Sequence, residues 1–291
     1  MAVRLGPRTR RALAVLLPAL ALTLVAVGST AVNANTTPTP QVTTWEYLPG
    51  VEADFYKPHR TRLHSVPLVV MIPGGGWQTA DRTGLGQLAA ALSARGIAAT
   101  NATYRVGQVA SQFPVPAQDI TCAIDASVAA AKRAGLRPDP VIVLGHSAGA
   151  HLSSLAAFGA PSFRTSQCPY PRNRVDGWVG LSGVYDLTIV GQWSWTMMGG
   201  TAEELPELYA QAGTATYLPT APKNIDALVV QGDSDDILIS TSIATDFAQL
   251  LRQHRFQTQL TIIPGADHQA TYQAPVIADT LVSWVRQVER H

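Results

Sequence analysis

Residues 141–149 read VIVLGHSAG, and this stretch decides the fold. Its apolar, largely β-branched start predicts a buried strand, and the small residues after Ser147 predict a helix that continues to about Phe158. Between them lies Gly145-His146-Ser147-Ala148-Gly149, a G-x-S-x-G sequence at a strand-to-helix turn. Such a turn strains the serine backbone and projects its hydroxyl above the sheet, while the glycines let strand and helix approach closely. The alternative is a glycine-rich turn with an ordinary serine.

Strands and helices alternate on both sides of this turn. Apolar runs predict strands at 66–72, 97–104, 141–144, 175–181, 227–231 and 259–263, with strand-like sequence from about Val42. Helical periodicity predicts helices at 84–95, 117–134, 147–158, 240–253 and 274–289. We therefore predict an α/β fold, with a doubly wound, mostly parallel sheet flanked by helices.

One segment of the predicted domain, which spans 42–291, breaks this alternation. Residues 186–223 contain no clear strand but hold a cluster of tryptophan and methionine side chains. We interpret 186–223 as a short cap-like insertion over the active site. The large apolar side chains expected to line a substrate pocket are Trp77, Trp193, Trp195 and Met198. The alternative is that such side chains only pack the insertion onto the domain.

The N-terminal segment differs in composition from the rest. Arginines at positions 4, 8, 10 and 11 precede an apolar run over 12–27 and then small residues, which is the pattern of a secretory signal peptide. We predict a signal peptide over 1–34, a linker over 35–41 and a secreted, extracellular protein without stable membrane insertion after cleavage. Cleavage after Ala31, an uncleaved anchor and twin-arginine export are the alternatives.

Composition narrows the range of partners. The chain has 291 residues, of which 21 are basic and 20 acidic, so no nucleic-acid partner is indicated and a small-molecule substrate is expected. Cys122 and Cys168 are the two cysteines, and in an exported protein they predict one disulfide, with two free thiols as the alternative. No metal site and no cofactor are expected. The oligomeric state has no signal in the sequence.

Ser147 needs a base within hydrogen-bond reach, because a serine hydroxyl is a weak nucleophile at neutral pH. After a turn of this kind the acid and then the histidine follow the serine along the chain. His268 follows the predicted strand 259–263, at the carboxyl end of which sites form in open α/β sheets. We predict His268 as the base, with His254 and His291 as alternatives. His146 and His151 flank the turn and are expected to be packed or hydrogen-bonding neighbours.

The acid is expected after the strand 227–231, where the sequence reads Gly232-Asp233-Ser234-Asp235-Asp236. Asp235 stands where the loop turns after the strand, and we predict it as the acid that orients the histidine. Asp233 and Asp236 are the alternatives, with turn or cap roles if Asp235 is the acid.

A glycine-rich turn follows the strand 66–72. Its amides at Gly75 and Gly76, together with the amide of Ala148, are predicted to form an oxyanion hole for a tetrahedral intermediate. A phosphate-binding loop is the competing interpretation. No Gly-Lys-Ser or Gly-Lys-Thr sequence follows, which argues against nucleotide binding.

These motifs resemble a known family. The resemblance rests on the Gly-His-Ser-Ala-Gly turn and on Pro73-Gly74-Gly75-Gly76-Trp77, Asp81-Arg82, Tyr104-Arg105, Phe113-Pro114 and Asp119. The chain resembles the esterase/lipase branch of the α/β-hydrolases, which includes hormone-sensitive-lipase-like and feruloyl-esterase-like carboxylesterases, over about residues 42–291. The resemblance implies hydrolysis of carboxylic esters through an acyl-enzyme, and Asp235 as the acid.

One departure from the family pattern concerns the oxyanion loop. The family commonly has histidine where this chain has Pro73, and that histidine supports the loop rather than the chemistry. The departure therefore concerns the rigidity of the loop and the range of substrates.

Three other functions compete with this interpretation. One is a lipase or polyester hydrolase that acts on insoluble substrate, and another is a serine peptidase of the prolyl-oligopeptidase type, which usually carries a further large domain. The third is a non-enzymatic binding domain.

Overall fold

The computed structural model describes residues 1–2, 40–58, 65–237 and 240–289. All the described helices and strands lie in one compact unit, Thr37–His291. Apart from residues 1 and 2, the predicted signal peptide lies outside the described residues, as does the predicted linker up to residue 39. Within the described part of the chain, no helix combines the length and the apolar character needed to cross a membrane.

An eight-stranded sheet forms the middle layer of the described unit. In spatial order its strands are β1 (Gln41–Leu48), β2 (Val51–Lys57), β4 (Ala98–Ala102), β3 (Val66–Ile72), β5 (Pro138–His146), β6 (Gly177–Leu181), β7 (Asp226–Gly232) and β8 (Thr258–Ile263). β1 and β2 are antiparallel to their neighbours, and all pairings from β4 to β8 are parallel. The prediction of a mostly parallel sheet is confirmed.

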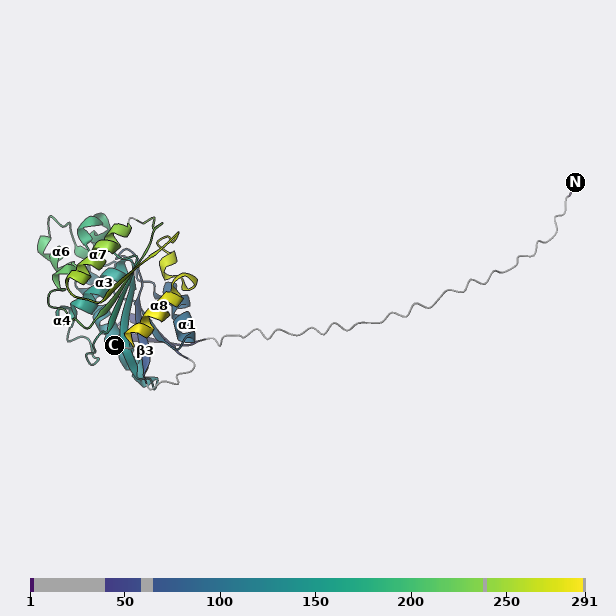
Figure 1. Ribbon diagram of the computed structural model, residues 1–291, viewed down its shortest axis with the longest axis horizontal. Helices are drawn as coiled ribbons and strands as arrows, with labels where there is room; N and C mark the ends of the chain where they lie inside the picture. Colours follow the sequence, from purple (N-terminus) through teal and green to yellow (C-terminus); the bar gives the residue numbers. More distant parts are fainter. Residues whose placement is uncertain (3–39, 59–64, 238–239, 290–291) are drawn as a thin grey trace. The chain divides into compact units, whose positions relative to one another are not determined.

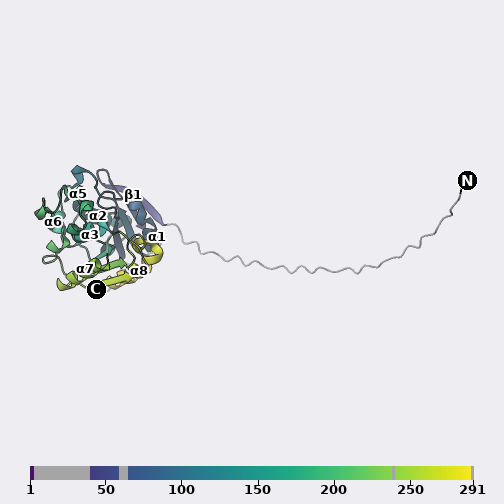
Figure 2. The ribbon, with the colours of Figure 1, turned by 90° about the horizontal axis from the view of Figure 1, so that it is seen from above.

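Helices cover both faces of this sheet (Figure 1). One face carries α2 (Val115–Arg133), α3 (Ala148–Phe158) and α7 (Thr241–Gln253), and the other carries α1 (Gly86–Ala94) and α8 (Ala274–Val288). Figure 2 shows the same layers from above, with α1 beside α8. Because successive side chains of a strand point to opposite faces, a strand between two helical layers must be apolar throughout. The all-buried sequence of β3 meets this requirement.

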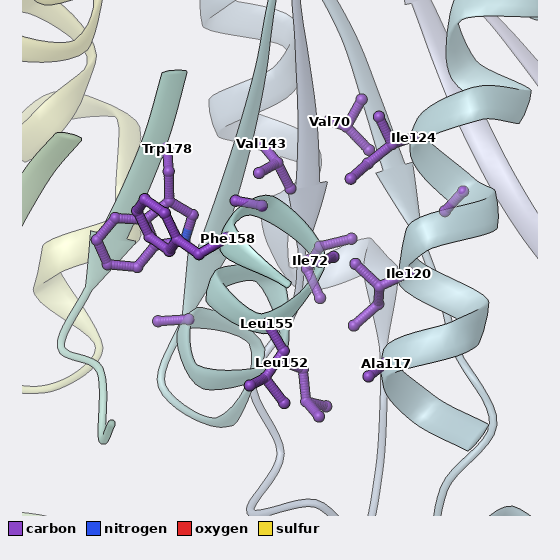
Figure 3. Close-up of a cluster of buried hydrophobic side chains, with 14 of the residues drawn as sticks. Val70, Ile72, Ala117, Ile120, Ile124, Val143, Leu152, Leu155, Phe158 and Trp178 are labelled. Atoms are coloured by element: carbon purple, nitrogen blue, oxygen red, sulfur yellow. The ribbon is translucent and has the colours of Figure 1, made fainter. Parts of the chain in front are cut away.

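The core on the α2 and α3 face shows how this alternation works. Val70 and Ile72 of β3 pack on this face, whereas Val69 and Met71 belong to the core beneath α1 and α8. In Figure 3, Ile120 of α2 lies beside the sheet residue Ile72, and Leu152 and Leu155 project from α3. The packing holds α3, and therefore the turn that precedes it, firmly against the sheet.

The segment 186–223 consists of short helices without a strand. These are η3 (Leu187–Ile189), α5 (Gln192–Met198), α6 (Pro206–Ala212) and η4 (Thr214–Thr216). The other short helices described are η1 (Arg82–Leu85), η2 (Val109–Ser111), α4 (Ala160–Phe163) and η5 (Ala270–Tyr272).

A disulfide joins Cys122 of α2 to Cys168, as predicted, with 5.5 Å between the two Cα atoms. Next to it, Asp125 of the same helix forms an ion pair with Arg164 and accepts a hydrogen bond of 2.6 Å from the backbone N–H of Asn173. The disulfide and these polar contacts together attach the segment after α4 to α2.

Candidate active site

The turn between β5 and α3 has the strained geometry predicted for it. Ser147 has φ 54° and ψ −123°, in a region that residues other than glycine rarely occupy. A Cβ at Gly145 would lie 2.1 Å from the carbonyl oxygen of Gly149, and a Cβ at Gly149 would lie 2.4 Å from that of Ile72. Only glycine fits at either position. The backbone N–H of Ser147 donates to Leu181 of β6 over 2.9 Å, which anchors the turn to the sheet.

His268 and Asp235 form a buried pair beside this turn. His268 Nδ1–H donates to Asp235 Oδ2 over 2.8 Å, and the two side chains are 4% and 1% exposed. With Nδ1 as the donor, Nε2 of the neutral ring carries the lone pair that a general base needs. His268 and Ser147 line the same cavity, without a direct hydrogen bond between them among the described contacts. In unliganded sites this bond commonly tightens only when substrate binds.

The other two aspartates of the loop that follows β7 have different surroundings from Asp235. Asp233 is exposed, and its carboxylate accepts a hydrogen bond of 2.7 Å from the backbone N–H of Gly265, which ties two loops together. Asp236 is exposed. Among the three candidates, Asp235 is the one that the loop directs toward His268.

Gln231 holds Asp235 in place, a role that the sequence did not suggest. Its side-chain Nε2–H donates to Asp235 Oδ2 over 2.8 Å, and the backbone N–H of Ile237 donates to Oδ1 over 3.1 Å. Gln231 is fully buried near the end of β7. An amide side chain at the end of an otherwise apolar strand is the signal that would have identified it, because buried polar groups need partners.

His146 supports His268 from the other side. Its Nε2–H donates to the backbone carbonyl of His268 over 2.9 Å, and the two rings lie 4.7 Å apart. The Thr271 hydroxyl donates to the same carbonyl over 3.1 Å. Burial lowers the pKa of His146 from 6.5 to about 3, so the ring is neutral and can hold His268 without adding charge. The prediction of a hydrogen-bonding neighbour is confirmed.

The loop after β3 offers free backbone donors. Within the described part of the chain, the amides of Gly75, Gly76 and Ala148 donate to no other residue. The loop folds back on itself, since Gln78 and Thr79 both donate to the carbonyl of Gly75. Position 74 requires glycine, because a Cβ there would lie only 2.9 Å from the Cβ of Ser147. The loop is therefore packed directly against the turn that bears Ser147.

Two side chains hold this loop although Pro73 replaces the common histidine. The Tyr104 hydroxyl donates to the carbonyl of Pro73 over 2.9 Å, and the indole N–H of Trp77 donates to His151 Nδ1 over 3.1 Å. His151 Nε2–H in turn donates to the carbonyl of Ala212 at the end of α6 over 2.7 Å. Burial lowers the pKa of His151 to about 4. The loop is thus anchored at both ends by buried bonds.

A cavity of about 350 Å³ opens above Ser147. Among the residues that line it are the loop glycines, polar side chains (Asp81, Gln269, Tyr272) and apolar side chains (Leu85, Trp193, Ile237). Of the four predicted pocket residues, Trp193 lies in its wall. Trp77 and Met198 are buried, at 3% and 2% exposed, and Trp195 is 44% exposed and outside the lining.

Two further cavities are lined in part by residues of the segment 186–223. One of about 460 Å³ shares Gly75, Gly76 and Trp193 with the first. The other, of about 860 Å³, lies between the segment 186–223 and α7, and none of the predicted site residues lines it. The cavity of about 860 Å³ is therefore not the candidate active site, although it is larger than the cavity above Ser147.

Comparison with known proteins agrees with this architecture. The BD-FAE family model matches residues 53–251. The chain is 27% identical over 215 residues to esterase LipC of Mycobacterium tuberculosis, covering 69% of this chain and 52% of that protein. It is 25% identical over 235 residues to the probable isoprenylcysteine alpha-carbonyl methylesterase ICME of Oryza sativa subsp. japonica, covering 76% of this chain and 55% of that protein. The chain thus spans about half the length of these curated relatives.

The backbone also matches solved structures. A truncated carbohydrate esterase from gut microbiota superposes with a TM-score of 0.74 at 16% identity, covering 87% of this chain and 98% of that one. This likeness concerns the fold, and it confirms the predicted α/β-hydrolase architecture. With the family match extending from β2 into α7, the chain belongs to the BD-FAE family of α/β-hydrolase esterases.

Proposed function

We propose that this protein hydrolyses small carboxylic esters, with Ser147 as nucleophile, His268 as general base and Asp235 as the acid that orients it. The observation that carries the proposal is the buried 2.8 Å bond between His268 and Asp235 beside the strained Ser147 turn, with His268 and Ser147 both lining one cavity. The family and the two esterase relatives support the same reaction class.

In the proposed mechanism, Ser147 Oγ attacks the ester carbonyl carbon while His268 Nε2 takes the hydroxyl proton. Asp235 stabilises the imidazolium that forms. The carbonyl oxygen becomes an oxyanion that accepts hydrogen bonds from the backbone of Gly75, Gly76 and Ala148. Collapse of the intermediate breaks the bond to the alcohol, which leaves with the proton from His268. Water then attacks the acyl-enzyme with the same proton transfers and releases the acid.

The cavity favours a small ester over a long-chain lipid. Its volume of about 350 Å³ is near the lower end of the roughly 300–1,000 Å³ typical of small-molecule sites. Its wall mixes apolar side chains with Asp81 and Gln269, which suits an alcohol that carries polar groups. A lipase or polyester hydrolase is the second candidate, because the exposed Trp193 offers apolar surface at the wall of the cavity.

The test is a panel of p-nitrophenyl esters from acetate to palmitate. Ser147→Ala should lower kcat by at least about 10⁴-fold, and Asp235→Asn by about 10⁴-fold, because the histidine loses its correct tautomer. Asp233→Asn is the matched control in the same loop and should retain most activity. Equal rates for Ser147→Ala and the unmodified protein would refute the mechanism. A rate that peaks at long acyl chains would favour the lipase alternative.

We also propose that the protein acts outside the cytoplasm. The disulfide between Cys122 and Cys168 supports this, because such bonds persist in oxidising compartments. N-terminal sequencing of the protein recovered from the culture medium should begin at Asn35, the residue after the predicted cleavage point. Recovery of the activity only from the cytoplasmic fraction, with an intact N-terminus, would contradict the proposal.

A further inference from the structure

The backbone of the oxyanion loop is held in a strained conformation. Gly75, Gly76 and Trp77 have φ of 139°, 58° and 57° in succession. Glycine tolerates such values, but a tryptophan does so at a cost of about 1 kcal/mol or more, and such strain persists only where the surroundings over-determine it. The surroundings of Trp77 therefore hold this part of the loop in its strained conformation.

These surroundings include a buried bond to the helix that follows the candidate nucleophile. Trp77 is 3% exposed and His151 is fully buried, and the indole N–H donates to His151 Nδ1 over 3.1 Å. The two rings meet edge to face at 5.8 Å. The other ring nitrogen of His151 donates to the carbonyl of Ala212 over 2.7 Å. One neutral tautomer satisfies both bonds.

The position of His151 makes this bond relevant to the oxyanion hole. The proposed donors come from two separate elements: Gly75 and Gly76 from the loop, and Ala148 from the first turn of α3. Preorganised donors are effective only when each lies about 2.7–3.1 Å from the developing oxyanion. His151 lies three residues after Ala148 on α3, so its bond to Trp77 fixes the loop relative to the helix that carries the other donor.

We propose that Trp77 and His151 are positioning residues. They hold the loop donors of the oxyanion hole at a fixed position relative to the donor on α3 and, through Ala212, connect both to the segment 186–223. This inference rests on the proposed ester hydrolysis at Ser147. Neither residue lines the cavity above Ser147 or the one beside it. Their effect is on the placement of the Gly75 and Gly76 amides, which interact most strongly with the transition state.

Kinetics of three variants test the inference. Trp77→Phe and His151→Phe should each lower kcat about tenfold with little change in KM, and the double variant should be no worse than either single one. Trp178→Phe is the matched control, because the Trp178 indole also makes a buried 3.1 Å bond to α3, to Ser153, but does not touch the loop. The control should lose stability and keep its kcat. Equal kcat values for Trp77→Phe and Trp178→Phe would overturn the inference.

Conservative replacement separates positioning from simple packing. His151→Gln retains a donor for the carbonyl of Ala212 and an acceptor for the Trp77 indole, so it should recover most of the kcat lost in His151→Phe. No difference between the two variants of His151 would mean that the hydrogen bonds do not matter.

Hydrogen exchange gives a readout that does not depend on activity. Amides in residues 74–79 should exchange faster in His151→Phe than in the unmodified protein, while the Trp178→Phe control should leave them unchanged. Unchanged exchange of this segment in His151→Phe would refute the positioning role whatever the reaction proves to be. Ester hydrolysis that survives Ser147→Ala would instead refute the proposed function, so the two failures are distinguishable.

Discussion

Acid should destabilise this protein because two buried histidines are held neutral. His146 and His151 are 5% and 0% exposed, and burial lowers their pKa values from 6.5 to about 3 and about 4. In the unfolded chain both return to about 6.5. Below that pH the unfolded chain binds protons that the folded chain does not. The stability that these two neutral histidines contribute is therefore fully present above about pH 6.5 and is lost as the pH falls toward their lower pKa values in the folded protein.

The magnitude follows from one proton for each histidine. A difference of one bound proton changes the free energy of unfolding by about 1.4 kcal/mol for each pH unit. For His151, the interval between 6.5 and about 4 corresponds to a loss of about 3 kcal/mol. His151→Gln removes this titrating group. The slope of the unfolding free energy against pH between about 6 and about 4.5 should then decrease by about 1.4 kcal/mol for each unit.

Urea unfolding at several pH values between about 7 and about 4.5 measures this slope. Trp178→Phe serves again as the control, because it weakens a buried bond without removing a titratable group. It should lower the unfolding free energy by a similar amount at every pH. Parallel pH curves for His151→Gln and the unmodified protein would refute the assignment of His151 as a buried neutral histidine.

Three further predictions concern other parts of the fold. Replacing Cys122 and Cys168 by serine should lower the unfolding free energy by about 4 kcal/mol, since the bond joins positions 46 apart; an unchanged calorimetric midpoint would contradict this. Gln231→Leu removes a donor from Asp235 and should lower kcat about tenfold in steady-state assays, with KM little changed. Gly145→Ala places a Cβ 2.1 Å from a backbone oxygen and should destabilise the fold by about 3 kcal/mol or more. A circular dichroism melt like that of the unmodified protein would contradict this close packing of the turn.

The parts of the fold that local sequence determines could be predicted closely. β3 occupies the predicted range 66–72, because a strand buried on both faces requires a continuous apolar run and Pro73 ends it. The Ser147 turn was identifiable because its two glycines are needed wherever strand and helix approach so closely. The order of acid and histidine along the chain then restricted the partners of Ser147 to a few positions.

Features that depend on distant contacts were not visible in the sequence. Trp77 was predicted to line the substrate pocket, but its indole turns toward His151, which is 74 positions away. The backbone of Trp77 is left-handed, with φ 57°, and no periodicity in the sequence predicts that conformation. The bond from His146 to the backbone of His268 likewise forms only when the end of β5 and the loop after β8 converge. Gln231 is different, because it lies only four positions before Asp235. The choice among three neighbouring aspartates depends on the path of the loop after β7, for which composition provides no rule.

Trp193 has a practical consequence for engineering. Its side chain is 41% exposed and lies in the walls of two cavities, of about 350 Å³ and about 460 Å³, which also share Gly75 and Gly76. The glycines cannot be varied without disturbing the loop, whereas the indole can be shortened. We expect Trp193→Ala to join the two cavities and to raise the rate for hexanoate relative to acetate esters in competition assays. A small library at this single position is therefore the most direct route to broader substrate scope.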